Sequence, residues 1–334
     1  MLYFLNCHYT ILRSLFMHSK RILITGGAGF IGSHLIPKLL KNKNTVFVLD
    51  DLSTGSLANL EPFRKNPKFI FKKGSVLNRK DLRPLVAKVD YIYHLAASVG
   101  VKYVVEKPLY SMVNNTEGTA MVLKLACEKK VPVLITSTSE VYGKLDATPF
   151  KETSDRMYGS AYNERWGYAL SKAVDEFVAL AYWREKKLPV VIVRLFNTVG
   201  PGQSEKFGMV IPRLIKQAMS GEPMTVYGDG KQVRCFGHVD DVTDALIKLL
   251  SLKKVYGEIV NLGSNRPTTI NMLAKTIKKI TGSSSKIVHI PYEKVYSKTF
   301  EDMRKRIPDL TKAWNLIGYK PRYTLEQIMR SILE

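Results

Sequence analysis

A tyrosine and a lysine stand four residues apart at Tyr168 and Lys172, a spacing that places both side chains on one face of a helix. A lysine cation beside a phenol lowers the pKa of the phenol, so Tyr168 could serve as a base near neutral pH. A cluster of hydroxyl side chains, residues 137–139, ends an apolar run earlier in the chain. Phenol, ammonium and hydroxyl groups together could move a proton to and from a substrate oxygen.

A glycine-rich turn over residues 26–32 follows the apolar run at 22–24. Its three glycines, three residues apart, permit a tight turn and a close approach to a pyrophosphate, and the helix that follows offers free N–H groups to that anion. A second strand, 45–49, ends at Asp50, where an acid binds the adenosine ribose hydroxyls. Asp51 follows, and no arginine stands there to pair with a 2′-phosphate. The segment predicts a site for NAD rather than NADP.

Apolar runs and amphipathic segments alternate along the first 200 residues. This alternation is typical of a parallel sheet covered by helices on both faces. It predicts an α/β fold, a Rossmann-type doubly wound parallel sheet. Pro37 lies inside the first helix and should kink its axis. The expected strands cover residues 22–24, 45–49, 69–71, 91–97, 133–135 and 190–193, and the expected helices begin at Ser33 and cover 116–129 and 168–187.

Past Gly200 the loops become richer in glycine and proline, and the elements become shorter. We expect an N-terminal extension without order over residues 1–19 and an NAD-binding Rossmann domain with the catalytic residues over 20–200. Residues 201–334 should form a smaller mixed α/β substrate lobe, with some strands and helices returning to the main domain. Such a lobe would cover the carboxyl ends of the strands, where α/β sheets bind ligands.

The composition narrows the class of partner. Of 334 residues, 51 are Lys or Arg and 29 are Asp or Glu, a net charge of +22, but the cations are spread along the chain without a basic block. We therefore expect no nucleic-acid partner, and a positive potential that draws in a polyanionic small substrate. The three cysteines have no paired spacing, which predicts no disulfide, no metal site and a cytoplasmic setting. The apolar run at 11–16 is too short to span a membrane.

At this point the chain resembles the extended short-chain dehydrogenase/reductase family of NAD-dependent enzymes that modify nucleotide sugars, including UDP-glucuronate decarboxylases and UDP-glucose 4-epimerases. The resemblance covers residue 20 to the end. It rests on Gly26-x-x-Gly29-x-x-Gly32, Asp50-Asp51-Leu52-Ser53-Thr54-Gly55, His94-Leu95-Ala96-Ala97, Asn115-x-x-Gly118-Thr119, Ser137-Thr138-Ser139-Glu140-Val141-Tyr142-Gly143, Tyr168-x-x-x-Lys172 and Arg194-x-Phe196-Asn197-x-x-Gly200-Pro201.

The resemblance implies roles for individual residues. Thr138 or Ser139 would polarise the sugar oxygen, Tyr168 would be the acid and base, and Lys172 would hold Tyr168 and the nicotinamide ribose. The implied cofactor contacts are Gly26, Gly29, Phe30, Ile31, Gly32, Asp50, Asp51, Ser53, Thr54, Gly55, Ser75, Val76, Leu95, Ala96, Ala97, Tyr168 and Lys172. The implied substrate contacts are Asn197, Arg213, Arg234 and Arg306.

Two positions depart from the family pattern. The family usually has an acid after Gly74 to contact the adenine, and this chain has Ser75. An arginine commonly follows Gly200-Pro201, and this chain has Gly202. The adenine contact and one anion contact are therefore without an assigned residue.

The resemblance leaves three reactions open, all through a 4-keto sugar. Glu140 and Arg234 would act near C5 and C6, which favours decarboxylation of UDP-glucuronate to UDP-xylose. The alternatives are a UDP-glucose or UDP-glucuronate 4-epimerase and a 4,6-dehydratase of a nucleotide sugar. The family also implies a homodimer through the helices at 116–129 and 168–187, with Val174, Val178 and Ala181 on the contact face.

Overall fold

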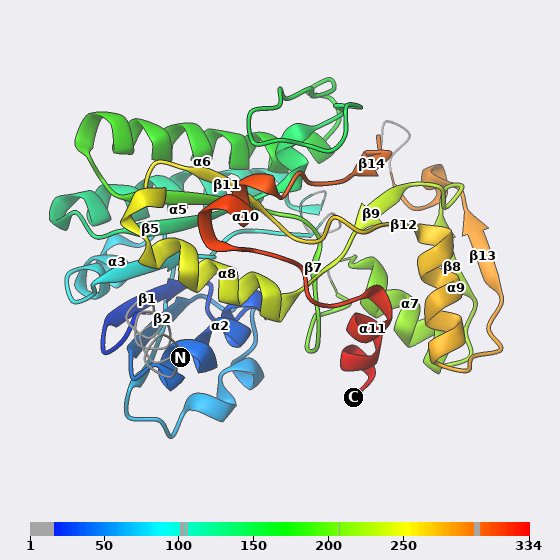
Figure 1. The fold of residues 1–334 in the computed structure, drawn as a ribbon, viewed down its shortest axis with the longest axis horizontal. Coiled ribbons are helices and arrows are strands. Elements are labelled where there is room, and N and C mark those ends of the chain that lie inside the picture. Colours follow the sequence, from blue (N-terminus) through cyan, green and yellow to red (C-terminus); the bar gives the residue numbers. More distant parts are fainter. Residues whose placement is uncertain (1–16, 101–103, 105, 207, 297–300) are drawn as a thin grey trace, which may run out of the picture.

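The computed structural model describes residues 17–100, 104, 106–206, 208–296 and 301–334. Its centre is a seven-stranded parallel sheet in the order β11-β6-β5-β4-β1-β2-β3 (Figure 1). The predicted doubly wound α/β fold is confirmed. The strands are β1 Arg21–Thr25, β2 Thr45–Asp50, β3 Phe69–Lys73, β4 Tyr91–His94, β5 Val133–Thr138, β6 Val190–Leu195 and β11 Ile259–Leu262.

Alternating side chains of the strands enter two separate cores, because successive residues of a strand point to opposite faces. Ile22 and Ile24 of β1 pack on one face with α2 (Phe30–Lys41), α8 (Val239–Ser251) and α10 (Thr311–Ile317). Leu23 packs on the other face with the remaining large helices. Those helices are α3 (Arg79–Val86), α5 (Pro108–Lys129) and α6 (Arg165–Lys186), and they lie on the opposite side of the sheet from α2 and α8 in Figure 1.

Four predicted boundaries were wrong. Helix α5 starts at Pro108 instead of 116, because its first turns bury polar residues such as Ser111 and Asn114 and so lack an apolar stripe. Proline is well tolerated at a first helical position. Helix α6 starts at Arg165 instead of 168, and β4 ends at His94 instead of Ala97. Helix α2 continues through Pro37 and starts at Phe30, directly after the glycine turn.

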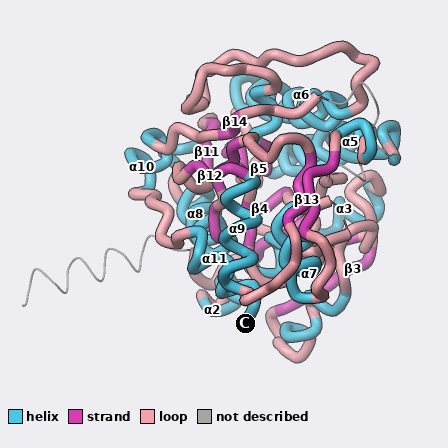
Figure 2. The backbone as a smooth tube through the Cα atoms, turned by 90° about the vertical axis from the view of Figure 1, so that its right-hand side faces the viewer, coloured by secondary structure: helices cyan, strands magenta, loops and turns pink. Residues whose placement is uncertain are grey.

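A smaller group of elements follows β6 in the sequence and lies together on the side that faces the viewer in Figure 2. It has its own apolar core. Strand β11 and helices α8 and α10 return from this part of the chain to the main sheet. The other elements are β7 Thr198–Val199, α7 Val210–Met219, β8 Met224–Tyr227, β9 Val233–Cys235, β10 Gly237–His238, β12 Pro267–Thr269, α9 Ile270–Ile280, β13 Ile287–Ile290, β14 Lys305–Arg306 and α11 Leu325–Leu333.

The expected N-terminal extension of residues 1–19 falls outside the described residues as far as residue 16. Met17 is described and belongs to the core, with 4% of its surface exposed. Its carbonyl accepts a hydrogen bond from the Asn44 side chain, and its sulfur lies 3.6 Å from the Tyr93 hydroxyl. The packed part of the chain therefore begins at least three residues before the predicted boundary at residue 20. None of the helices in the described ranges has the length and apolarity to cross a membrane.

Candidate active site

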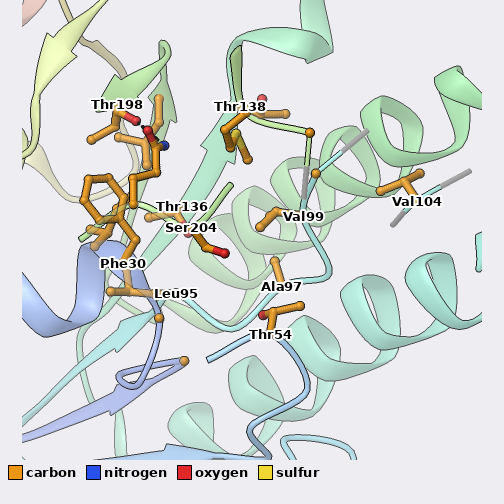
Figure 3. A pocket seen from close by; sticks show the side chains of 18 of the residues that line it. Phe30, Thr54, Leu95, Ala97, Val99, Val104, Thr136, Thr138, Thr198 and Ser204 are labelled. Atoms are coloured by element: carbon orange, nitrogen blue, oxygen red, sulfur yellow. Dashed lines mark hydrogen bonds between the residues drawn. The ribbon is translucent and has the colours of Figure 1, made fainter. Parts of the chain in front are cut away.

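A cavity of about 930 Å³ opens at the carboxyl ends of the strands, between the sheet and the smaller group of elements. Figure 3 shows the side chains that converge on it from separate elements: Phe30 from the start of α2, Thr136 and Thr138 from β5, and Thr198 from β7. The cavity lining contains the predicted cofactor residues Gly26, Gly29, Phe30, Ile31, Gly32, Asp50, Asp51, Ser53, Thr54, Gly55, Ser75, Val76, Leu95, Ala96, Ala97 and Tyr168.

Backbone packing builds the part of the cavity around the glycine turn, which we name the cofactor half. Gly26 has a φ of +74°, and a Cβ there would lie 2.6 Å from the Ala96 nitrogen. A Cβ on Gly32 would lie 2.6 Å from the Gly27 Cα. Both positions therefore need glycine for steric reasons. The resulting cradle brings the N-terminus of α2 to the cavity wall, where a dinucleotide pyrophosphate fits.

Asp50 connects this turn to the end of β2. One carboxylate oxygen accepts a hydrogen bond from the Ala28 backbone N–H at 2.9 Å, and the other accepts one from Leu52 at 2.8 Å. Burial raises the pKa of Asp50, and these two hydrogen bonds oppose that rise. The carboxylate also lines the cavity, so it holds the loop in shape and faces a ligand there.

The two residues that depart from the family pattern both lie on the cavity wall. Ser75 lines the cavity, and its backbone N–H donates to Asp81 at 3.4 Å, so a carboxylate lies close behind the position where the family has its acid. Gly202 also lines the cavity, with open space where a side chain would extend. Lys206 of the same loop lines the cavity as well.

The proton-transfer residues lie where β5 meets the start of α6. Thr138 and Tyr168 both line the cavity, and the Thr138 hydroxyl lies close enough to the Tyr168 hydroxyl to lower its pKa. Ser139 is 1% exposed and lies behind the lining, in the short helix η3 Ser139–Tyr142. Of the two predicted hydroxyl residues, Thr138 is therefore the one that faces Tyr168.

The expected lowering of the Tyr168 pKa by Lys172 is wrong for this structure. Burial raises the pKa of Tyr168 well above its ordinary value, and the charge of Glu140 raises it further, while the Thr138 hydrogen bond opposes the rise. Lys172 is almost fully buried behind the cavity lining, and its Nζ contacts Asp175 at 2.7 Å.

A set of five charged side chains occupies the opposite part of the cavity, which we name the substrate half. Its members, the charged cluster, are Glu140, Arg165, Arg234, Asp302 and Arg306, and all five line the cavity. Arg306 contacts Glu140 at 3.2 Å, while Arg234 donates to both oxygens of Asp302 at 2.9 and 3.1 Å. Arg165 lies 3.4 Å from the same Asp302 carboxylate.

Electrostatics keep the two carboxylates of the charged cluster ionised. Burial raises the pKa of Glu140, but the charges of Arg306 and the two other arginines outweigh it and lower that pKa. The pKa of Asp302 is lowered in the same way, against the effect of burial. Burial and the neighbouring Arg234 lower the pKa of Arg306 to about 10. At neutral pH the cluster therefore holds three cations and two anions.

Asn197 and Arg213 were also predicted to contact the substrate, and both line the cavity. The Asn197 amide donates to the Cys235 carbonyl at 3.1 Å. The Arg213 guanidinium stacks 3.7 Å from the centre of the Tyr227 ring, and its Nε has no hydrogen-bond partner within the described residues. Among those same residues, no group of His, Cys, Asp and Glu side chains has the geometry of a metal site.

Sequence reasoning missed Arg165 and Asp302 as members of the site. Arg165 precedes Tyr168 by three residues, so the helical spacing alone could have placed both on one face. Asp302 had no comparable signal. It reaches the cavity because β14 pairs with β9, which puts Arg306 beside Arg234.

The profile of the family described as GDP-mannose 4,6 dehydratase matches residues 23–332. The chain belongs to this family. It is thus an enzyme of the extended short-chain dehydrogenase/reductase group, as its motifs predicted.

Among curated relatives of this chain, a UDP-N-acetyl-alpha-D-glucosaminuronate decarboxylase of Bacillus cytotoxicus is 42% identical to it over 94% of this chain and 97% of the relative. UDP-glucuronic acid decarboxylase 1 of Xenopus tropicalis is 36% identical over 92% of this chain and 70% of the relative. Among solved structures, a UDP-glucuronic acid 4-epimerase of Bacillus cereus, with UDP-glucuronic acid and NAD, has a TM-score of 0.84 at 30% identity, covering 93% of this chain and 97% of that chain.

Proposed function

We propose that this enzyme binds NAD and removes the C6 carboxylate of a UDP-hexuronate as CO₂. The charged cluster carries the proposal. Three guanidinium groups share two carboxylates, so the charged cluster carries a net positive charge. A carboxylate on the sugar is attracted by that charge, whereas a neutral hexose is not.

The cofactor half supports the choice of NAD. Its glycine cradle admits a pyrophosphate, and Asp50 and Asp51 line the same wall. When bound, NAD accepts a hydride from C4 of the sugar and later returns it. Gly26, Gly32 and the N-terminus of α2 would hold its pyrophosphate, and Asp50 its adenosine ribose.

Tyr168 accepts the proton of the C4 hydroxyl while the hydride leaves C4, and Thr138 holds the same oxygen by a hydrogen bond. The resulting C4 ketone lies β to the C6 carboxylate. The C5–C6 bond then breaks, CO₂ leaves, and the electron pair of that bond passes into the C4–C5 enolate. C5 takes a proton from water, reduced cofactor would supply the hydride to C4, and Tyr168 returns its proton to the C4 oxygen.

The charged cluster favours binding of the substrate over the product. Arg234 and Arg306 attract the sugar carboxylate, and Glu140 lies in contact with Arg306 on the same wall. Loss of CO₂ removes the negative charge that the arginines hold, so the product is bound less tightly than the substrate.

Two hexuronates fit this description, the glucuronate and its 2-acetamido derivative. We favour the 2-acetamido sugar as the first substrate to test, because the decarboxylase named for it is 42% identical to this chain, against 36% for a glucuronate decarboxylase. UDP-xylose would be the product from UDP-glucuronate.

Product masses test the proposal. Purified enzyme should be incubated with both hexuronates, with UDP-glucose and with dTDP-glucose, and the products should be weighed by mass spectrometry. We expect loss of CO₂ from a hexuronate and no turnover of the neutral sugars. Conversion without a change in mass would make the enzyme an epimerase, and loss of water would make it a dehydratase. Either result contradicts the proposal.

We also propose a homodimer. Leu170, Val174, Phe177 and Ala181 form an exposed stripe on α6, whereas Val178 packs inward and is corrected from the predicted contact face. Helix α5 packs beside α6, so the two can form a four-helix contact with a second copy. Light scattering at micromolar concentration should give twice the monomer mass, and Phe177→Glu should shift it to the monomer mass. We place the enzyme in the cytoplasm, because the described cysteines, Cys127 and Cys235, are free thiols.

A further inference from the structure

Behind the cavity lining, Lys172 and Asp175 form an ion pair that the reaction scheme above does not use. The Nζ to Oδ2 distance is 2.7 Å, and the two side chains are 2% and 1% exposed. They lie three residues apart on α6, one turn beyond Tyr168. A carboxylate and an ammonium buried this deeply strongly depend on each other, because either alone would be an unpaired charge away from water.

A chain of polar contacts fixes the pair to the rest of the sheet. The Thr25 hydroxyl lies 2.7 Å from His94 Nδ1, and His94 Nε2 lies 3.1 Å from the Thr119 hydroxyl. The Thr119 hydroxyl lies near the Asp175 carboxylate and opposes the rise of its pKa that burial causes. The contacts therefore run from the end of β1, beside the glycine turn, through β4 and α5 to α6.

Titratable groups reach this pair from several elements. Tyr168 and Glu176 face it from α6 and His94 from β4, while Glu140 of η3 and Arg306 of β14 act on Tyr168 from the cavity side. Burial and the Lys172 charge lower the pKa of His94 to about 3, so this imidazole is neutral at neutral pH. Glu176 forms an ion pair with Arg194 at 2.8 Å. Asp175 is thus the carboxylate in direct contact with the Lys172 ammonium.

We propose that Asp175 is a positioning residue for hydride transfer at C4: its carboxylate anchors the Lys172 ammonium beside Tyr168 and sets the balance of charge around the phenol. The inference rests on the proposed C4 oxidation, which decarboxylase, epimerase and dehydratase share. It does not depend on the loss of CO₂. Without the anchor, the Lys172 ammonium would lose its counter-charge, and the negative charge of Asp175 would no longer act on Tyr168.

The pH profile distinguishes this role from simple packing. In Asp175→Asn the negative charge that raises the Tyr168 pKa is gone, so the acidic limb of the profile moves to lower pH. The buried ammonium loses its counter-charge and sheds its proton more readily, so the basic limb moves the same way. We expect a displacement of about one pH unit, the lower end of the effect of a nearby charge.

Cofactor reduction in a single turnover, followed by absorbance, measures this profile without reference to CO₂. Asp175→Glu keeps the charge on a longer side chain, so its profile should stay in place while the rate constant of hydride transfer, and with it kcat measured in steady state, falls several-fold and KM is unchanged. A profile of Asp175→Asn that falls in height without moving would overturn the proposal, as would an Asp175→Glu variant with unchanged kcat. The glutamate variant carries the test if the asparagine variant does not fold.

Thermal unfolding of the ligand-free protein gives a second readout. The unfolded chain binds the Lys172 proton more tightly than folded Asp175→Asn does, so the stability of this variant should rise relative to wild type from pH 7 to 10. Asp229→Asn is the control, since it breaks an exposed pair with Arg304 whose charges do not change in this range. The stability that Asp229→Asn loses relative to wild type should be the same from pH 7 to 10. A constant deficit for Asp175→Asn would show that packing alone is lost and would overturn the proposal.

Discussion

The two halves of the cavity differ in the groups that form their walls. The cofactor half is mostly backbone, shaped by β1, α2 and β2, which follow one another within residues 21–50. The substrate half is mostly side-chain charge, gathered from η3, α6, β9 and β14 across residues 139–306. The first half recognises its ligand by shape and by N–H groups. The second recognises its ligand by completing a set of charges.

This difference determines what each half tolerates. A glycine cradle fails when any side chain fills it, because the neighbouring atoms are backbone and cannot move aside. The charged cluster stops recognising its ligand when its net charge changes, even if every side chain keeps its size.

Tyr168 stands at the junction, so its loss should stop both halves from working together. Tyr168→Phe removes the proton acceptor and keeps the ring, and turnover should fall by about 10²–10⁴. Steady-state rates measure the loss, and circular dichroism should show an intact fold. Tyr162→Phe, at a side chain that is 90% exposed, is the matched control and should leave the turnover rate unchanged. Near-normal turnover of Tyr168→Phe would show that another group takes the proton.

The same difference explains how much could be read from the sequence. The glycine turn, β1, β2 and Asp50 are contiguous, so local motif and strand pattern were sufficient to predict them. Tyr168 and Lys172 were found by helical spacing. Asp302 could not be found, because its place depends on the parallel pairing of β14 with β9.

Charge states were harder to predict than positions. The spacing of Lys172 suggested a cation acting on Tyr168, but Asp175, one turn further along α6, takes that cation as its partner. Glu140 was expected near C5 and C6, and the cavity wall is where it lies. Its partner Arg306 was expected among the substrate contacts, but the pairing of the two was not predicted, because no pattern in the sequence joins positions so far apart.

In the substrate half, Glu140→Gln should separate two steps of the reaction. The change keeps the shape but removes one of the two negative charges of the charged cluster, so CO₂ release should fall by about 10², at the lower end for an acid–base group. Cofactor reduction should survive, because Thr138 and Tyr168 remain. Labelled CO₂ and nicotinamide absorbance measure the two steps. Glu326→Gln on the exposed face of α11 is the control. Equal loss of both steps would place Glu140 in C4 chemistry instead.

In the cofactor half, Gly32→Ala should damage the fold and the cradle together. The new Cβ would meet the Gly27 Cα at 2.6 Å and the Gly27 carbonyl at 2.7 Å. Overpacking against backbone costs on the order of 1–3 kcal/mol of folding free energy. Denaturant unfolding measures it, with Gly167→Ala as the control, because a Cβ there would contact Met112 at an ordinary 3.4 Å. A stable Gly32→Ala variant would mean that the turn can relax.

The smallest expected effect is the choice between the two dinucleotides, and it asks whether the cofactor half also uses charge. Asp50 and Asp51 line the wall where the adenosine ribose fits, and neither has a cation in contact within the described residues. A 2′-phosphate would face two carboxylates there, and like charges at close range repel.

We expect NAD to bind at least tenfold more tightly than NADP, about 1.4 kcal/mol. Calorimetric titration of both cofactors measures the ratio. Asp51→Asn is the informative variant, because its carboxylate contacts the Ser53 backbone N–H at 2.9 Å on an exposed loop, whereas Asp50 also holds the glycine turn. The preference should shrink in Asp51→Asn while NAD affinity is kept. Equal affinities in the wild-type enzyme would mean that the cofactor half selects by shape alone.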